Sequence, residues 1–283
     1  MAALKEIKKR INSIKSTRKT TSAMKMVSSS KLRKAEGKML NIRHYSEALR
    51  HIMEVLPTNG YISPFCMERP VKNVALIAFS SDSSLCGAFN SNISRELQKT
   101  CLHYKQSAGI ESLFVYTIGK KVNDLFRKTD IPVTKFFENL AAKPDYKIVS
   151  DFANMLIKQF EKKQIDRVDL IYHHFKSAGV QKIRNIPLLP FTLPEQQIET
   201  NYIIEPSRLE VFNMLIPDII RIQLYMALLE SSTSEHAARM VAMQTATDNA
   251  ADLISGLTIE YNKSRQQAIT NELLDLIGGS TNQ

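Results

Sequence analysis

The chain of 283 residues contains no tryptophan, nine glycines and three cysteines. The cysteines (Cys66, Cys86 and Cys101) are odd in number and irregularly spaced, which predicts reduced thiols rather than a disulfide framework or a zinc site. A hydrophobic content of 43% with little glycine and proline excludes a disordered or collagen-like chain. Because no run reaches about 18 uncharged apolar residues, no segment is expected to span a membrane by itself.

Several targeting and catalytic motifs are also missing. The start, "ALKEIKKRI", has no apolar core before a small-residue cleavage site, so we expect no secretory signal. Glu6 and a helical pattern that runs on through Leu56 argue against an organelle transit peptide. There is no G-x-x-x-x-G-K-[ST] loop and no G-x-G-x-x-G turn after a strand, so neither kind of nucleotide site is expected.

Positive charge is concentrated at one end of the chain. Residues 1–56 hold fourteen Lys and Arg against four acids, which equals the net charge of +10 of the whole chain. Residues 207–279 hold five Lys and Arg against nine acids, a balance of −4. A localised positive field predicts a polyanion or an acidic protein surface as partner.

The first segment predicts one long helix, because residues 2–56 contain no proline and one glycine. Apolar or small residues recur there at spacings of three and four, as in a coiled coil. The stripe consists of Leu4, Ile7, Ile11, Ile14, Leu32, Ala35, Met39, Ile42, Leu49, Met53 and Leu56. Between Ile14 and Leu32 the same positions fall on Arg18, Thr21, Lys25 and Ser28, so the apolar stripe is interrupted. Pro57 is expected to end the helix.

The middle segment, residues 71–205, alternates between strand and helix patterns, which predicts an α/β domain with a mainly parallel sheet. Strands are expected at 71–79, 112–119, 131–137, 167–175 and 180–190. The last two are joined by "KSAG", which is short enough for an antiparallel hairpin. Helices are expected at 93–104, after 119 and at 146–163.

The last segment, 209–276, again predicts a long helix, with a break near Leu215 because of Pro217. Two helical segments of similar length and opposite charge flank one α/β domain. We therefore predict an antiparallel two-helix coiled coil, made from the two ends of the chain, with an inserted Rossmann-like α/β domain. The predicted boundaries are 1–57, 71–205 and 207–283.

Candidate chemistry in the middle segment is sparse. The loop "SSDSSLCGAFN" (80–90) has one glycine, Gly87, and is interpreted as a structural turn, with a phosphate cradle as the alternative. His173 and His174 are neighbours on a strand and point to opposite faces, so they are poorly placed to hold one metal ion. Cys86 lacks a recognisable base partner. We expect no catalytic residue, no cofactor and no metal site.

The basic stretch 15–34 admits three interpretations: a solvated helix face, a surface for an acidic partner, or a nucleic-acid-binding helix in a coiled-coil protein. The third is less favoured, because the zipper partner predicted here is the acidic end of the same chain. An α/β enzyme with helical arms is a further alternative, for which no site is found.

Three stretches resemble the γ subunit of F-type ATP synthases: "KEIKKRINSIKSTRKTTSAMKMVSSSKLRKAE", "SSDSSLCGAFN" and "ARMVAMQTATDNAADLI…YNKSRQQAITNELLDLIGG". The resemblance covers essentially the whole chain. It implies the rotor of the central stalk, which couples rotation of the membrane-embedded c-ring to conformational cycling of three catalytic β subunits. The implied partners are three α and three β subunits per copy, the ε subunit and the c-ring, at the cytoplasmic side of a bacterial plasma membrane.

The resemblance also implies a set of contacts to the β subunits, at Met24, Arg239, Arg265, Gln266 and Thr270. The chain departs from the family pattern at Ser83 and Ser84, where a basic residue and glycine are usual. A shaft that turns cannot keep a continuous apolar face against its housing. The interrupted stripe is therefore interpreted as a means of keeping contacts weak and reversible.

Overall fold

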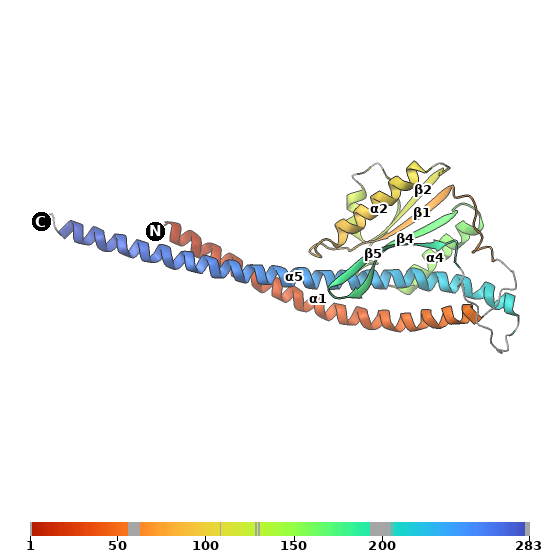
Figure 1. Cartoon of the computed structure of the whole chain (residues 1–283), viewed down its shortest axis with the longest axis horizontal. Coiled ribbons are helices and arrows are strands. Elements are labelled where there is room, and N and C mark those ends of the chain that lie inside the picture. The colour runs from red at the N-terminus through yellow and green to blue at the C-terminus, as the bar shows by residue number, and fades with distance from the viewer. Residues whose placement is uncertain are drawn as a thin grey trace. The chain divides into compact units, whose positions relative to one another are not determined.

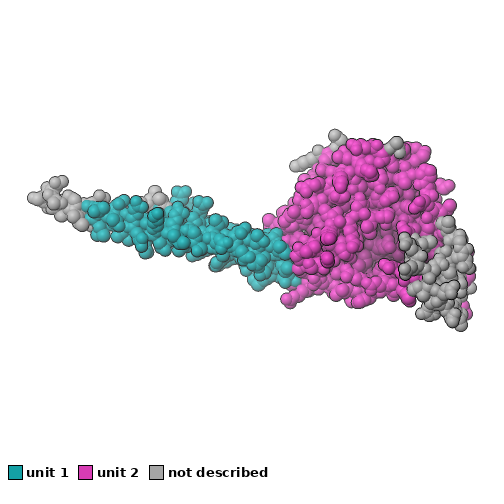
Figure 2. Space-filling model, viewed as in Figure 1, with its two compact units in different colours: residues 1–29, 239–283 teal, residues 30–238 magenta. Residues whose placement is uncertain are grey.

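The computed structural model describes residues 2–55, 63–107, 109–127, 129, 131–192, 205 and 207–280. The chain divides into two compact units: unit 1 comprises residues 1–29 and 239–283, and unit 2 comprises residues 30–238 (Figure 2). Pro57, the expected end of the first helix, lies outside the described residues.

The two long helices are α1 (Ala2–Val55) and α5 (Arg208–Ser280), and each contributes residues to both units (Figure 1). The predicted stripe of α1 is its covered face, because Ile11, Leu32, Met39, Leu49 and Met53 are all buried. Within the predicted interruption Arg18 is exposed, and the other stripe positions present hydroxyl or basic side chains to the covered side. The pattern of spacings therefore locates this face correctly.

The predicted break near Leu215 is wrong. Helix α5 runs from Arg208 to Ser280 with Pro217 inside it. Proline removes one backbone donor and normally kinks or ends a helix. Here Ile216, Ile219 and Ile220 surround it and are buried in the core of unit 2, so tertiary packing stabilises the helical conformation on both sides of the proline.

Unit 2 contains one five-stranded sheet with the order β3-β2-β1-β4-β5. The strands are β1 (Asn73–Phe79), β2 (Ser112–Ile118), β3 (Val133–Phe137), β4 (Arg167–Ser177) and β5 (Val180–Leu189). All neighbouring pairs are parallel except β4 and β5, which form the predicted antiparallel hairpin. The connecting helices are α2 (Phe89–Gln106), α3 (Lys120–Phe126) and α4 (Tyr146–Glu161).

The sheet is covered on both faces, which explains its almost wholly apolar central strands. Alternate residues of β1 separate the two cores: Leu76 faces α2 and α3, whereas Ile77 faces α4, α5 and the end of α1. Helix α4 begins at a good N-cap, because the Asp145 carboxylate accepts the backbone N–H groups of Lys147 and Ile148. Burying each Leu, Ile or Phe side chain contributes about 1.5–3 kcal/mol, so these two cores stabilise most of unit 2.

By length and composition alone, a stretch of α5 between Leu209 and Asn271 is apolar enough to cross a membrane, with a mean hydropathy of 1.3. However, 44% of that stretch is buried against the rest of the chain. The apolar residues Phe212, Ile216, Ile220 and Leu224 belong to the core beneath the sheet. Part of its hydropathy therefore comes from residues of this core.

Candidate functional site

Few side chains of the helix pair of unit 1 are fully buried. Among its described residues the buried side chains are those of Ile11, Ser28, Met243 and Ala250. The Thr247 hydroxyl lies 2.8 Å from the Thr21 hydroxyl across the pair, and 2.7 Å from the carbonyl oxygen of Met243. At Thr21 and Thr247 a pair of hydroxyls therefore replaces the large apolar contact that coiled coils usually make.

The outer surface of α1 in this unit is strongly basic. Seven of its cations are exposed: Lys5, Lys8, Lys9, Arg10, Lys15, Arg18 and Lys19. Neighbouring hydroxyls bond the helix itself, since Ser16, Thr17 and Thr20 each donate to the carbonyl oxygen four residues earlier. The surface thus presents positive charge, which fits an acidic partner.

The five predicted contact residues fall into separate places on unit 1. Met24 on α1 and Arg239 on α5 are half-buried, whereas Arg265, Gln266 and Thr270 are exposed on α5. The last three lie within two helical turns, and the Thr270 hydroxyl donates to the Gln266 carbonyl over 3.0 Å. At 1.5 Å per residue, they begin about 40 Å along α5 from Arg239. They form one polar cluster, and Arg239 belongs elsewhere.

Exposed apolar side chains on unit 1 were not anticipated from the sequence. Met26 is 64% exposed and Ile259 is 68% exposed. Others on the same unit are Val27, Val241, Leu253, Ile269, Leu273 and Leu274. They are spread along both helices of the unit, singly or as adjacent pairs. For Met26 and Val27 the available signal was that they lie off the spacing of the apolar stripe predicted for the first helix.

Hydrogen bonds hold the loop after β1 together and attach it to neighbouring segments. The Asn90 amide accepts the Ser81 backbone N–H over 3.0 Å and donates to the Ser81 hydroxyl over 2.7 Å. The Asp82 carboxylate accepts the backbone N–H groups of Lys120 at the start of α3 and of Ala142. These contacts favour the interpretation as a structural turn, because the loop's side chains are engaged in holding neighbouring segments.

The adjacent histidines face opposite sides of the sheet, as predicted. His173 stacks on Phe89 of α2, with ring centroids 4.1 Å apart, whereas Nδ1 of His174 lies 2.6 Å from the carboxylate of Glu230 on α5. Burial lowers the pKa of His173 to about 4, so this ring is neutral at physiological pH. No cluster of three or more potential metal ligands occurs among the described residues.

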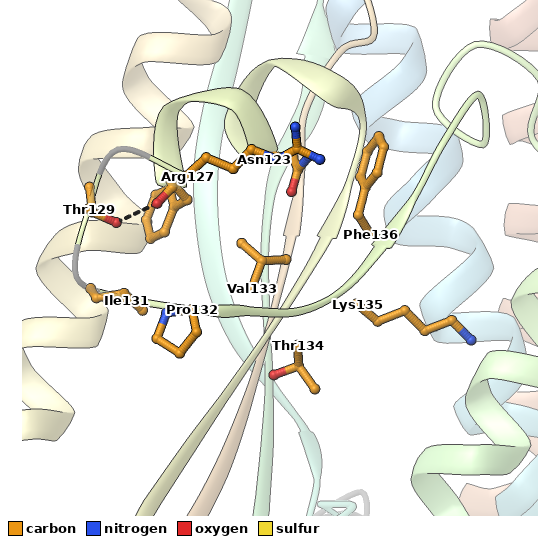
Figure 3. A pocket seen from close by; sticks show the side chains of 10 residues that line it. Asn123, Arg127, Thr129, Ile131, Pro132, Val133, Thr134, Lys135 and Phe136 are labelled. Carbon is orange, nitrogen blue, oxygen red and sulfur yellow. Dashed lines mark hydrogen bonds between the residues drawn. The ribbon is translucent and has the colours of Figure 1, made fainter.

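Two thiols and one hollow of unit 2 lack the features of a catalytic site. Burial raises the pKa of Cys66 and of Cys101 to about 11, which keeps both thiols protonated at neutral pH. A hollow of about 340 Å³ lies beside the edge strand β3 (Figure 3). Its titratable lining residues are Arg127 and Lys135, both cations, so no acid–base pair is present there.

The comparisons with known proteins agree over the whole chain. A family model described as "ATP synthase" matches residues 3–282. The chain is 48% identical to the ATP synthase gamma chain of Bacteroides fragilis, over 99% of both chains. It is 45% identical to the ATP synthase gamma chain of Bacteroides thetaiotaomicron, again over 99% of both. These relatives give no support to the nucleic-acid-binding alternative.

Solved structures show the same fold. The chain superposes on a chain of the Euglena gracilis mitochondrial ATP synthase, OSCP/F1/c-ring, with a TM-score of 0.68 at 20% identity, covering 99% of this chain and 94% of that one. It is also similar to a chain of the Tetrahymena thermophila mitochondrial ATP synthase central stalk and c-ring, with a TM-score of 0.58, 24% identity and coverage of 80% and 99%. On its sequence and its fold, the chain belongs to the ATP synthase gamma chain family.

Proposed function

We propose that this chain is the central-stalk rotor subunit of a proton-translocating F-type ATP synthase. The observation that carries the proposal is identity of 48% to a bacterial gamma chain over the full length of both proteins. In this role the chain is noncatalytic. It couples rotation of a membrane-embedded c-ring to the conformational cycle of three catalytic β subunits.

The structure of unit 1 suits a shaft that moves against its surroundings. Hydroxyls and small side chains contribute to its helix pair, and polar or charged residues stand between most of its exposed apolar side chains. A turning shaft acts like a ligand that favours a different conformation in each of three sites in turn, through different contacts. Weak and reversible polar contacts allow each step of rotation to break the contacts made in the step before.

We further propose that Met24, Arg239 and the cluster of Arg265, Gln266 and Thr270 contact the β subunits. The exposure of the cluster and the charge of its arginine support this assignment. Arginine presents a rigid fork of donors that matches carboxylates, so acidic loops are the expected partners. Met24 and Arg239 would contact β at a different height along the helix pair.

The proposed assembly contains one copy of this chain per three α and three β subunits, together with an ε subunit and the c-ring. The complex would be membrane-associated, with this chain peripheral to the membrane on the cytoplasmic side of a bacterial plasma membrane. Bacterial relatives of high identity support this location.

Assembly and activity test the proposal together. The chain is mixed with α and β subunits from the same source, and native mass spectrometry and ATP hydrolysis are measured. One bound copy per six head subunits, with hydrolysis raised above that of α and β alone, is the expected result. A chain that stays unbound, or that leaves hydrolysis unchanged, contradicts it.

A paired substitution tests the contact cluster. Arg265→Ala with Gln266→Ala should lower hydrolysis several-fold while assembly persists, because polar contacts made during each step are lost. The matched control is Asn262→Ala with Lys263→Ala, which removes one amide and one cation from exposed positions of the same helix. Equal losses in both double variants would refute a specific role for the cluster.

A further inference from the structure

Glu230 on α5 places a carboxylate where three elements of unit 2 meet. One oxygen, Oε1, lies 3.4 Å from Nη2 of Arg43 on α1, and the other, Oε2, lies 2.6 Å from Nδ1 of His174 on β4. The Glu230 side chain is only 8% exposed. One buried anion thus joins segments that are 187 and 56 residues away in the chain. We call Arg43, His174 and Glu230 the Glu230 joint.

A second polar bond extends the joint by one helical turn. The Ser234 hydroxyl donates to the carbonyl oxygen of His173 over 3.1 Å. Residues four apart on a helix share a face, so Glu230 and Ser234 hold two consecutive residues of β4. Ser231, Ser232 and Thr233 between them are buried but small. At this point directional bonds add to the apolar packing of α5 against the sheet.

Stability alone does not account for this arrangement. Replacing a buried ion pair with apolar residues of similar volume is often neutral or stabilising, because burying the charges costs much of what their attraction contributes. Apolar contact is non-directional and allows neighbouring elements to turn against each other. Hydrogen bonds and ion pairs depend on angle as well as distance, so they resist such turning.

We propose that Glu230 is a positioning residue that locks the sheet of unit 2 to both long helices against torsion. The proposal rests on the rotor function proposed above, since only a rotor must pass torque from its α/β domain to its helices. A carboxylate of α5 that bonds both α1 and β4 prevents either helix from rotating against the sheet when torque acts on the α/β domain. Under low torque the apolar core is enough to keep the helices in place. The Glu230 joint is needed when the load that opposes rotation rises.

The test replaces the joint with an apolar triad: Arg43→Met, His174→Leu and Glu230→Met. The variant chain is assembled with its α, β and ε subunits and membrane sector in sealed vesicles. ATP hydrolysis without a gradient and the largest proton gradient reached by ATP-driven pumping are measured, together with the melting temperature of the full chain. Melting temperature and unloaded hydrolysis should match wild type, while pumping against the gradient falls about 2- to 30-fold, the usual range for mutations that modulate coupling.

A matched control is available on the same strand. Asp169 on β4 is 3% exposed and lies 2.8 Å from Nε of Arg167 and 2.6 Å from the Tyr104 hydroxyl of α2. This group also combines a buried carboxylate, an arginine and a ring donor, but it ties β4 to α2 and not to the long helices. The apolar control, Tyr104→Phe with Arg167→Met and Asp169→Leu, should therefore pump as wild type does.

The outcomes separate the two proposals. If the wild-type chain does not restore pumping, the rotor function fails, and the role of the joint fails with it. If wild type pumps and the apolar triad reaches the same gradient, the torsional role is overturned while the rotor function stands. The torsional role is also overturned if the apolar triad and the apolar control lose pumping to the same extent. The same holds if the triad that loses pumping also has a lowered melting temperature.

A milder variant covers the case in which the apolar triad does not fold. Glu230→Gln keeps the shape of the side chain and removes its charge. Hydrogen–deuterium exchange of the full chain should then rise at residues 171–175 and 230–238 and stay unchanged across α2 and α3. The same variant should show a smaller loss of pumping that appears only against a gradient. Unchanged exchange and unchanged pumping would overturn the proposal.

Discussion

The hydroxyls of Thr21 on α1 and Thr247 on α5 lie 2.8 Å apart, although the residues are 226 positions apart in the chain. Thr21 occupies the interrupted part of the apolar stripe predicted for the first helix. Each hydroxyl also lies within hydrogen-bond distance of a carbonyl oxygen of its own helix. A polar bridge therefore stands where a coiled coil would normally place two apolar side chains.

The double variant Thr21→Val with Thr247→Val is expected to leave the stability of the full chain unchanged or to raise it. Replacing both partners of a hydrogen bond with apolar groups of the same shape is nearly neutral. Thr21→Val alone loses the bridge while Thr247 keeps its bond to the Met243 carbonyl oxygen, so it should cost no more than about 1 kcal/mol. Thermal unfolding followed by circular dichroism measures both effects. Thr20→Val, whose exposed hydroxyl bonds only its own helix, is the control.

Acid should destabilise unit 2 through His173. Burial lowers the pKa of its ring to about 4 from an unfolded value of 6.5, so the unfolded chain binds the proton first as pH falls. The contribution is fully present above pH 6.5 and is lost progressively between pH 6.5 and pH 4. At about 1.4 kcal/mol per pKa unit, the loss amounts to about 3 kcal/mol.

The measurement compares urea unfolding of wild type and His173→Phe at pH values across that window. The phenylalanine variant keeps the stacking on Phe89 but has no titrating ring, so its stability should fall less with acid. At neutral pH it should be at least as stable, because Nδ1 of His173 has no hydrogen-bond partner among the described residues. The exposed His103→Gln serves as control, and parallel pH curves for wild type and His173→Phe would contradict the prediction.

Local periodicity was enough to predict the two long helices, the alternation of strands and helices between them, and the hairpin of β4 and β5. It was enough because the stripe positions and the apolar runs report which face of each element is covered. It failed at Pro217, where a local rule predicted a break and the packing of Ile216, Ile219 and Ile220 prevents one. Local propensity is a weak guide wherever the core surrounds an element.

The long-range polar contacts could not be predicted in the same way. The opposite facing of His173 and His174 follows from strand geometry, but their partners Phe89 and Glu230 come from elements elsewhere in the chain. The contact residues taken from the family resemblance stay predictions. What the structure adds is that Arg265, Gln266 and Thr270 are exposed together, while Met24 and Arg239 are half-buried.

Asp82 should stabilise the loop after β1 through both of its carboxylate oxygens. Oδ1 accepts the backbone N–H of Lys120 over 3.1 Å, and Oδ2 accepts that of Ala142 over 3.0 Å. Asp82→Ala removes both acceptors, one of them at the start of α3, and should cost about 1–2 kcal/mol. Asp82→Asn keeps one acceptor oxygen and should cost less. Urea unfolding of the full chain measures the difference, with the exposed Asp151→Ala as control, and a neutral Asp82→Ala would contradict the argument.

Two glycines of unit 2 should respond to alanine with opposite signs. Gly119 has φ of +97°, and an added Cβ would lie 2.2 Å from the backbone oxygen of Ser80, which cannot move without disturbing β1. Gly119→Ala should therefore destabilise the chain by at least about 3 kcal/mol, from strain and clash together. Gly37 lies in the exposed interior of α1 with open space around its Cβ position, so Gly37→Ala should stabilise by about 0.5–1 kcal/mol. Urea unfolding of the two single variants measures the change in the free energy of unfolding. Equal changes of the same sign would mean that neither backbone conformation nor the close approach to Ser80 governs the response.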